Sequence, residues 1–260
     1  MPTTLHGSGP VHYRKEGAGP GLVMVHGTGG DAVSNYAHLV PGLADVRTVI
    51  TPDYAGSGLT ADPGGDLTLD LLAGQVAAAF EEPSDLVGFS LGAAVAAKVA
   101  AERPELVRRL VLIAGWTHLA DSRLELGLRT WARLAATDPE SFAAYGPLMA
   151  FGPEFVSAAG ADTLMVGEPP KGTLRQIELD LRVDLRELLP KITAPTLVVG
   201  STRDYLIPVE HARALHAALP GSEYAELDSG HVVLHERPAE ITALIRDFIG
   251  VRDLIGSGTS

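Results

Sequence analysis

The sequence predicts an α/β fold built on one mostly parallel sheet with helices on both faces. Short apolar runs without polar alternation, bounded by Gly, Pro or Asp, are typical of strands that are buried on both sides. A helical pattern follows most of these runs, and this alternation indicates parallel strands joined by right-handed crossovers. With 260 residues, of which 46% are hydrophobic, the chain can bury one large core.

The apolar runs and the helical patterns fix the expected order of elements. Buried strands are expected at residues 21–25, 47–51, 85–89, 110–114 and 196–200, and a further strand at 222–227. Helices are expected at residues 67–80, 91–102, 209–218 and 239–249. The helix at 91–102 consists almost entirely of small residues, so it can lie close to the sheet as a central, fully covered helix.

The alternation of strands and helices breaks between residues 117 and 189. This stretch contains several aromatic residues, no clean strand, and helix-like patterns at 123–136 and 174–189. It is longer than a connecting loop should be, and long insertions at the carboxyl edge of such sheets usually cover a site. We therefore expect an α/β core over 1–116 and 190–255, a helical cap (lid) over 117–189, and a flexible tail over 256–260.

Composition excludes several classes of function. The 20 basic and 32 acidic residues give a net charge of −12, so the chain offers no overall basic character for binding nucleic acid. The absence of cysteine excludes disulfides, thiolate metal sites, iron–sulfur clusters and a cysteine nucleophile. No signal segment is visible, and no apolar run approaches the roughly 20 residues of a membrane span. We expect a cytoplasmic monomer or homodimer with a small-molecule substrate and no nucleic-acid or membrane partner.

The strongest local motif is Gly88-Phe89-Ser90-Leu91-Gly92, which fits G-x-S-x-G between a predicted strand and an Ala-rich helix. A nucleophilic serine must project its Oγ from a sharp strand-to-helix turn, which leaves no room for side chains two positions before and after it. The helix N-terminus adds unpaired N–H groups and a positive dipole end. A glycine-flanked N-cap serine is the alternative, but it does not explain both glycines. Ser90 is therefore the candidate nucleophile.

A nucleophilic serine needs a base, and the base needs an orienting acid, in the chain order Ser, acid, His. Asp204 lies just beyond the predicted strand at 196–200, and His231 lies in a glycine-containing loop after the predicted strand at 222–227. Because parallel strands bring their carboxyl ends to one edge of the sheet, both residues should lie beside Ser90. The sequence therefore predicts a catalytic triad of Ser90, Asp204 and His231.

Other acids and a second histidine are alternatives to members of this triad. Asp228 lies three residues before His231, but it is more typical of a turn or an N-cap. Asp180 and Asp184 belong to the predicted cap and could approach, although a solvated helix face is the simpler interpretation. His235 follows His231 at helical spacing, yet the pair lacks the Glu of H-E-x-x-H and a nearby third ligand, so we expect no metal.

The loop His26-Gly27-Thr28-Gly29-Gly30 follows the first deep strand, where acyl transfer needs a second backbone donor for the oxyanion. Glycines let such a loop turn tightly and approach a ligand, so that its amides can point inward. We assign the oxyanion hole to the backbone N–H groups of Thr28 and Leu91. His26 is expected to hold the loop by hydrogen bonds rather than to take part in the chemistry.

The motifs HGTGG, GFSLG, STRD and SGH, in this order and spacing, closely resemble those of the α/β-hydrolase fold superfamily over essentially the whole chain. The resemblance implies a mostly parallel eight-stranded sheet, an antiparallel first hairpin near residues 3–15, and a cap inserted after the sixth strand. It also supports Ser90 as nucleophile, Asp204 as acid and His231 as base, with no cofactor. Because the elbow carries Ser rather than Asp, dehalogenase and epoxide hydrolase chemistry is disfavoured and an acyl-enzyme is favoured.

The predicted cap gives the only information about the substrate. Trp116 and His118, which follow the strand at 110–114, are expected to line the pocket, and Gly29 and Trp131 are further candidates. The other cap aromatics could line the pocket or form the core of the cap, and the sequence leaves this open. A pocket with few charges would suit a hydrophobic acyl group or a small aromatic substrate.

These observations favour a serine hydrolase that cleaves a carboxylic ester, lactone or thioester of a hydrophobic small molecule. The Ala-, Arg- and Leu-rich composition suggests a high-GC bacterium, where such proteins often serve specialised-metabolite pathways. Three alternatives use the same fold: an acyltransferase or cyclase, a cofactor-free lyase, and a ligand-binding receptor with little turnover. Sequence motifs do not choose among them, because fold alone does not set the substrate.

Overall fold

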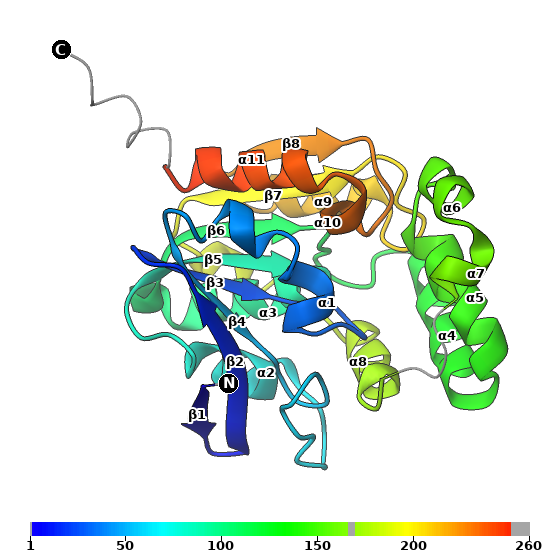
Figure 1. The fold of residues 1–260 in the computed structure, drawn as a ribbon, viewed down its shortest axis with the longest axis horizontal. Coiled ribbons are helices and arrows are strands. Elements are labelled where there is room, and N and C mark those ends of the chain that lie inside the picture. Colours follow the sequence, from blue (N-terminus) through cyan, green and yellow to red (C-terminus); the bar gives the residue numbers. More distant parts are fainter. Residues whose placement is uncertain (1, 166–169, 251–260) are drawn as a thin grey trace.

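A computed structural model describes residues 2–165 and 170–250 of the chain; the tail predicted at 256–260 lies outside this part. Within it, eight strands form one sheet in the order β1-β2-β4-β3-β5-β6-β7-β8 (Figure 1). The strands are β1 (Thr3–His6), β2 (Gly9–Glu16), β3 (Gly21–Val25), β4 (Thr48–Pro52), β5 (Ser84–Phe89), β6 (Val107–Ile113), β7 (Thr196–Ser201) and β8 (Glu223–Leu227).

The sheet is parallel from β4 to β8, and its first two strands are antiparallel. β1 pairs with β2 and β2 pairs with β4 in antiparallel register, whereas the remaining neighbours pair in parallel. The predicted fold class and the antiparallel first hairpin are therefore confirmed. The sixth strand begins three residues earlier than expected, at Val107, because Arg108 and Arg109 continue the strand beyond its apolar run.

Two hydrophobic clusters cover the two faces of the sheet. Successive residues of β3 alternate between them: Val23 and Val25 belong to one cluster, and Leu22 and Met24 belong to the other. Since side chains along a strand point alternately to opposite faces, the two clusters lie on opposite sides. The first contains α2 (Leu69–Ala77), α3 (Leu91–Glu102) and α9 (Val209–Ala217); the second contains α1 (Ala32–Tyr36), α10 (Val233–Glu236) and α11 (Pro238–Phe248).

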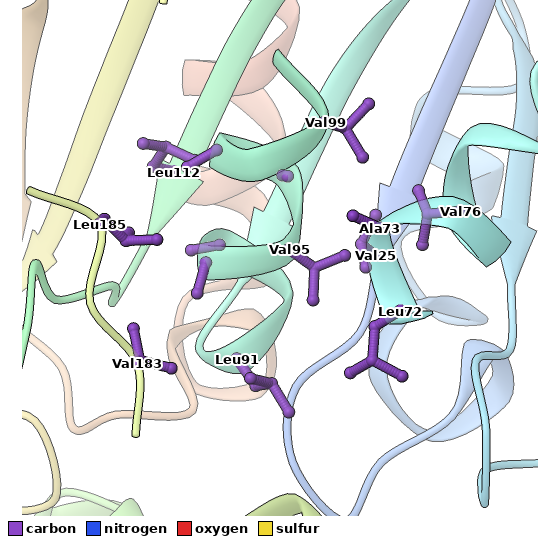
Figure 2. Packing of buried hydrophobic residues seen from close by; sticks show 14 of the residues in the cluster. Val25, Leu72, Ala73, Val76, Leu91, Val95, Val99, Leu112, Val183 and Leu185 are labelled. Atoms are coloured by element: carbon purple, nitrogen blue, oxygen red, sulfur yellow. The ribbon is translucent and has the colours of Figure 1, made fainter. Parts of the chain in front are cut away.

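Helix α3 is the centre of the first cluster, and its bounds match the prediction. Leu91 to Ala101 are all buried, as expected for a helix of small residues that lies close to the sheet. Figure 2 shows Leu91, Val95 and Val99 between the apolar side chains of α2 on one side and Val183 and Leu185 on the other. The carboxyl end of β5 is thereby joined to a helix that packing holds on every side.

The 117–189 insertion contains five helices in its described residues. They are α4 (Ser122–Thr137), α5 (Pro139–Ala150), α6 (Pro153–Ala159), α7 (Ala161–Leu164) and α8 (Thr173–Asp180). Helices α4 to α7 gather beyond the carboxyl ends of the parallel strands, and α8 lies closer to the sheet (Figure 1). The helix predicted at 123–136 is confirmed, with one extra residue at each end.

The helix predicted at 174–189 is wrong beyond Asp180, where α8 ends. The following residues run beside the end of β6 instead: the Leu185 amide donates to the Thr117 carbonyl at 2.7 Å, and Asp184 forms an isolated bridge with His118. Burial of an irregular segment therefore produced the apolar spacing that resembled a helix.

None of the described helices is long and apolar enough to cross a lipid bilayer.

Candidate active site

Ser90 lies on the sharp turn between β5 and α3. Its backbone has φ 56° and ψ −123°, a conformation that non-glycine residues rarely adopt. A side chain at Gly88 would collide with the backbone of Gly92, and one at Gly92 would collide with the carbonyl of Val25. Both flanking glycines are therefore required by close backbone packing, which a simple N-cap serine would not need.

The structure brings Ser90, His231 and Asp204 together in one chain of hydrogen bonds. His231 Nε2 lies 2.9 Å from Ser90 Oγ, and His231 Nδ1 lies 2.7 Å from Asp204 Oδ2. The three residues are 6%, 3% and 6% exposed, so water has little access to these bonds. Because the carboxylate accepts from Nδ1–H, Nε2 is left as the acceptor for the Ser90 hydroxyl.

The loop after β7 fixes the carboxylate of Asp204. Its Oδ1 accepts from the amides of Leu206 and Ile207 at 2.9 and 2.7 Å, which leaves Oδ2 for His231. Phe89 lies beside the imidazole, with ring centroids 5.2 Å apart. The histidine is therefore held both by a bound acid and by an aromatic neighbour.

The alternative acids lie elsewhere. Asp228 is exposed and pairs with Arg203, and that ion pair holds the pKa of Asp228 at about 2. Asp184 is also exposed, and its pairing with Arg186 lowers its pKa to about 2. Asp180 is only 2% exposed, so the interpretation of that residue as part of a solvated helix face is wrong.

His235 takes no part in the hydrogen-bonded chain of Ser90, His231 and Asp204. Its Nε2 lies 2.8 Å from the Ser34 carbonyl, and its ring lies 4.2 Å from that of His38. Burial lowers the pKa of His235. In residues 2–165 and 170–250 no group of three or more His, Asp or Glu side chains is arranged to hold a metal ion.

The loop at residues 27–30 lies against Ser90 at Gly27. The amide of Gly27 donates to Asn35 Oδ1 at 2.9 Å, that of Gly29 donates to Gln176 Oε1 at 2.9 Å, and that of Gly30 donates to the Gly27 carbonyl. Within the described part of the chain, the amides of Thr28 and Leu91 donate to no protein acceptor. These two N–H groups, the predicted oxyanion donors, are therefore left for a ligand.

His26 holds the base of this loop. It is fully buried, its Nδ1 lies 2.9 Å from the Gly27 carbonyl, and its ring lies 3.9 Å from that of Tyr54. Burial lowers the pKa of His26, which keeps the ring neutral. Its position agrees with the expected holding role.

A cavity of about 210 Å³ lies beside Ser90. Its walls are mainly apolar and come from α1, α4, α5, α7, the end of β5 and the loops at the carboxyl edge of the sheet. The lining residues are Thr28, Asn35, Phe89, Ser90, Trp131, Phe142, Gly146, Pro147, Ala150, Phe151, Leu164, Leu206, His231 and Val232. Apart from His231, no titratable side chain is among them, so the cavity suits an uncharged group.

The predicted pocket residues divide into two groups. Trp131 lines the cavity and lies parallel to Phe142, with ring centroids 6.2 Å apart. Trp116 is only 1% exposed and belongs to the core cluster, and His118 contacts Thr117 and Asp184. Neither residue is among those that line the cavity, because the chain turns into the core directly after β6.

Gly29, also a predicted pocket residue, faces α8 instead of the cavity, and Thr173 packs against it. Sequence reasoning missed Asn35, whose carboxamide holds Gly27 and lines the cavity. It also missed Gln176, which is separated from Gly29 by 147 residues. No local pattern marks either residue, since their roles depend on contacts between distant segments.

The turn between α5 and α6 is joined to the loop that carries His231. The Val232 amide donates to the Ala150 carbonyl at 3.0 Å. Glu236 Oε1 accepts from the amides of Gly152 and Gly230 at 2.9 and 3.1 Å. The residues on both sides of His231 are therefore bonded, directly or through Glu236, to the insertion.

The sheet order, the elbow and the buried Ser–His–Asp hydrogen bonds together define a hydrolase of the α/β type. The chain belongs to the alpha/beta hydrolase family, which it matches over residues 22–244. The predicted superfamily and the prediction of an enzyme are thus confirmed.

A relative by sequence supports this assignment, and solved structures share the fold. The chain is 40% identical over 259 residues to pyrrolizixenacetamide deacetylase of Xenorhabdus hominickii. The aligned region covers 95% of this chain and 97% of the relative. The enol-lactonase of Burkholderia xenovorans LB400 has a similar fold, with a TM-score of 0.85, 24% identity, and coverage of 95% and 99%. A thermophilic esterase of Thermogutta terrifontis has a TM-score of 0.81, 23% identity, and coverage of 95% and 96%.

Proposed function

We propose that the chain is a serine hydrolase that releases a small acyl group from an ester or amide of a hydrophobic small molecule through an acyl-enzyme. The observation that carries this proposal is the buried chain of hydrogen bonds from Asp204 through His231 to Ser90, beside an apolar cavity. Lactones and thioesters react by the same route. The assignment of the triad is part of this proposal.

In the first half-reaction, Ser90 Oγ attacks the carbonyl carbon while His231 Nε2 takes the hydroxyl proton. The carbonyl electron pair moves to oxygen, and the oxyanion accepts hydrogen bonds from the amides of Thr28 and Leu91. Each donor is worth about 3 kcal/mol in the transition state. Collapse of the intermediate breaks the bond to the leaving group, which takes the proton from His231.

In the second half-reaction, water replaces the leaving group. His231 Nε2 takes a proton from the water as its oxygen attacks the acyl carbon, and the same two amides bind the second oxyanion. Collapse releases the carboxylic acid and returns the proton to Ser90 Oγ. Asp204 keeps the imidazole in the required tautomer and stabilises its protonated form throughout.

The size of the cavity supports a small acyl group. About 210 Å³ is less than the roughly 300–1,000 Å³ that is typical of pockets for drug-sized ligands. The name of the 40% identical relative, a deacetylase of an acetamide, agrees with an acetyl-sized group. Helices α4, α5 and α7 supply Trp131, Phe142 and Leu164 to the walls, and Phe151 directly follows α5, which supports the 117–189 insertion as a substrate-selecting cap.

The proposal is tested by intact-mass spectrometry after treatment with a small fluorophosphonate, with Ser90→Ala as the matched control. We expect one adduct on the wild-type protein and none on the variant. Hydrolysis of p-nitrophenyl acetate and of a matched aryl acetamide should be lost in the same variant. An unlabelled wild-type protein, or a Ser90→Ala variant that still turns over, would rule out the acyl-enzyme.

A further inference from the structure

Three residues on one face of α8 lie along the loop that carries Thr28. Thr173, Gln176 and Asp180 have the spacing i, i+3, i+7, which places them on a single helix face. All three are at most 2% exposed. We infer that Gln176 and Asp180 are positioning residues that hold this loop, so that the Thr28 amide faces the carbonyl oxygen of a substrate at Ser90.

This inference rests on the proposed function, in which Thr28 is an oxyanion donor. Helix α8 belongs to the insertion. The inference gives this helix a role in positioning an oxyanion donor, separate from any role of the insertion in substrate choice.

Gln176 is fixed at both ends of its carboxamide. Its Oε1 accepts from the Gly29 amide at 2.9 Å, and its Nε2 donates to Ser57 Oγ at 2.9 Å and to the Ala55 carbonyl at 3.3 Å. Because the Gly29 amide can only donate, the orientation of the carboxamide is determined. Gln176 therefore fixes the orientation of the peptide group between Thr28 and Gly29 through its N–H.

Asp180, one turn further along α8, holds the side chain of Thr28. Its Oδ2 accepts from the Thr28 hydroxyl at 2.8 Å, and Thr173 packs against Gly29, whose φ is +70°. Thr28 is thus bound through its side chain and through the next amide, and its neighbour Gly27 is bound to Asn35. Little freedom remains for the Thr28 N–H itself, as expected for a preorganised donor.

The protonation state of Asp180 also matters for the reaction, because this buried carboxyl group binds Thr28. Burial raises its pKa to about 8, and the Thr28 hydroxyl only partly opposes this effect. Tyr54, on which the charge of Asp180 acts, stays neutral because burial raises its pKa well above the ordinary value, and Asp53 acts on the same Tyr54. The loop therefore meets a neutral carboxyl at pH 7. Above pH 8 a carboxylate would face the oxyanion across Thr28 and oppose its formation.

The main test compares the wild-type enzyme with Asp180→Asn, which keeps the size of the side chain and an oxygen for the Thr28 hydroxyl but cannot ionise. We measure kcat and KM for a short-chain ester from pH 6 to 9.5. The wild-type kcat should fall as the pH rises through about 8, with KM nearly constant. Asp180→Asn should lose this fall, because its side chain cannot ionise.

A second variant tests Gln176. Gln176→Met keeps the volume but leaves the Gly29 amide without its acceptor, so kcat should fall about 10- to 100-fold while KM changes less than threefold. Glu178→Gln is the matched control, because Glu178 is exposed on the same helix. Circular dichroism and melting curves show whether each variant folds; if Gln176→Met does not, the pH profile of Asp180→Asn decides.

Two results would overturn the inference: an alkaline fall that persists unchanged in Asp180→Asn, or a folded Gln176→Met whose kcat equals that of Glu178→Gln. Failure of the proposed function looks different, because Ser90→Ala would then retain turnover. The two ideas are therefore separable in the same set of assays.

Discussion

At the scale of single residues, the strained backbone of Ser90 explains why two glycines flank it. The left-handed φ of Ser90 sends the chain from β5 straight into α3, and Gly88 and Gly92 then lie too close to other backbone for any side chain. The motif could be recognised from sequence because these steric demands are local. The sequence predicts which residues partner Ser90 and their order along the chain. It does not predict the distances between their side chains.

The carboxylate of Asp204 carries the first residue-scale prediction. Asp204→Asn keeps an oxygen for the amides of Leu206 and Ile207 but presents an NH₂ group to His231 Nδ1. The imidazole would then take the wrong tautomer, and kcat for ester hydrolysis should fall about 10⁴-fold with the fold intact. Steady-state kinetics and a melting curve check both parts.

Asp228→Asn is the matched control for this change. Asp228 lies in the loop after β8 that also carries His231, but it is exposed and paired with Arg203. Its kcat should stay within about twofold of wild type. If the two variants lost activity equally, the assignment of Asp204 as the orienting acid would fail.

At the scale of elements, the accuracy of prediction followed the regularity of the packing. Helix α3 was predicted to the residue because a run of small residues ends at a sharp sterically defined turn on one side and near Pro104 on the other. Helix α8 was predicted too long, because Val183 and Leu185 are buried without being helical. Apolar spacing reports burial, and it reports helix only when the backbone is regular.

The walls of the cavity give a second prediction at this scale. Trp131 on α4 lines the cavity, so Trp131→Ala should enlarge it and raise kcat/KM for butyryl relative to acetyl esters by about tenfold. The measurement is a series of p-nitrophenyl esters of increasing acyl length. We expect activity toward the acetyl ester to fall, because the short acyl group loses contacts.

Leu126 provides the control on the same helix, since it is 68% exposed. Leu126→Ala should leave the order of preference among the esters unchanged. An unchanged order in Trp131→Ala as well would show that α4 does not form the acyl pocket.

At the scale of the whole molecule, the order of the chain predicted more of the site than its local patterns did. Ser90, Asp204 and His231 meet because parallel strands bring the loops after β5, β7 and β8 to one edge. The positions of Asn35, Gln176 and the cavity walls could not be predicted. They depend on how the insertion settles on the sheet, which involves contacts over more than a hundred residues.

Burial of Asp180 affects the stability of the whole fold. Its pKa is raised from 3.8 to about 8, so between pH 4 and 8 the folded state holds a proton that the unfolded state releases. The free energy of unfolding should therefore fall with rising pH across this window. Relative to wild type, the free energy of unfolding of Asp180→Asn should rise by about 3 kcal/mol between pH 5 and 7.5.

Urea denaturation of both proteins at the two pH values measures this difference, and contributions from all other groups cancel. Glu178→Gln should differ from wild type by the same amount at both pH values. A constant difference for Asp180→Asn too would mean that Asp180 is already ionised in the folded protein at neutral pH.

The bonds between the insertion and the two loops beside Ser90 limit how the enzyme can be re-engineered. Val232 bonds to Ala150, Glu236 joins Gly152 to Gly230, and α8 binds Gly29. A chimera that received residues 117–189 from another family member would lose these matched partners at once. Transplanting substrate preference would therefore require exchanging both receiving loops together with the helices, so the insertion is not an interchangeable module.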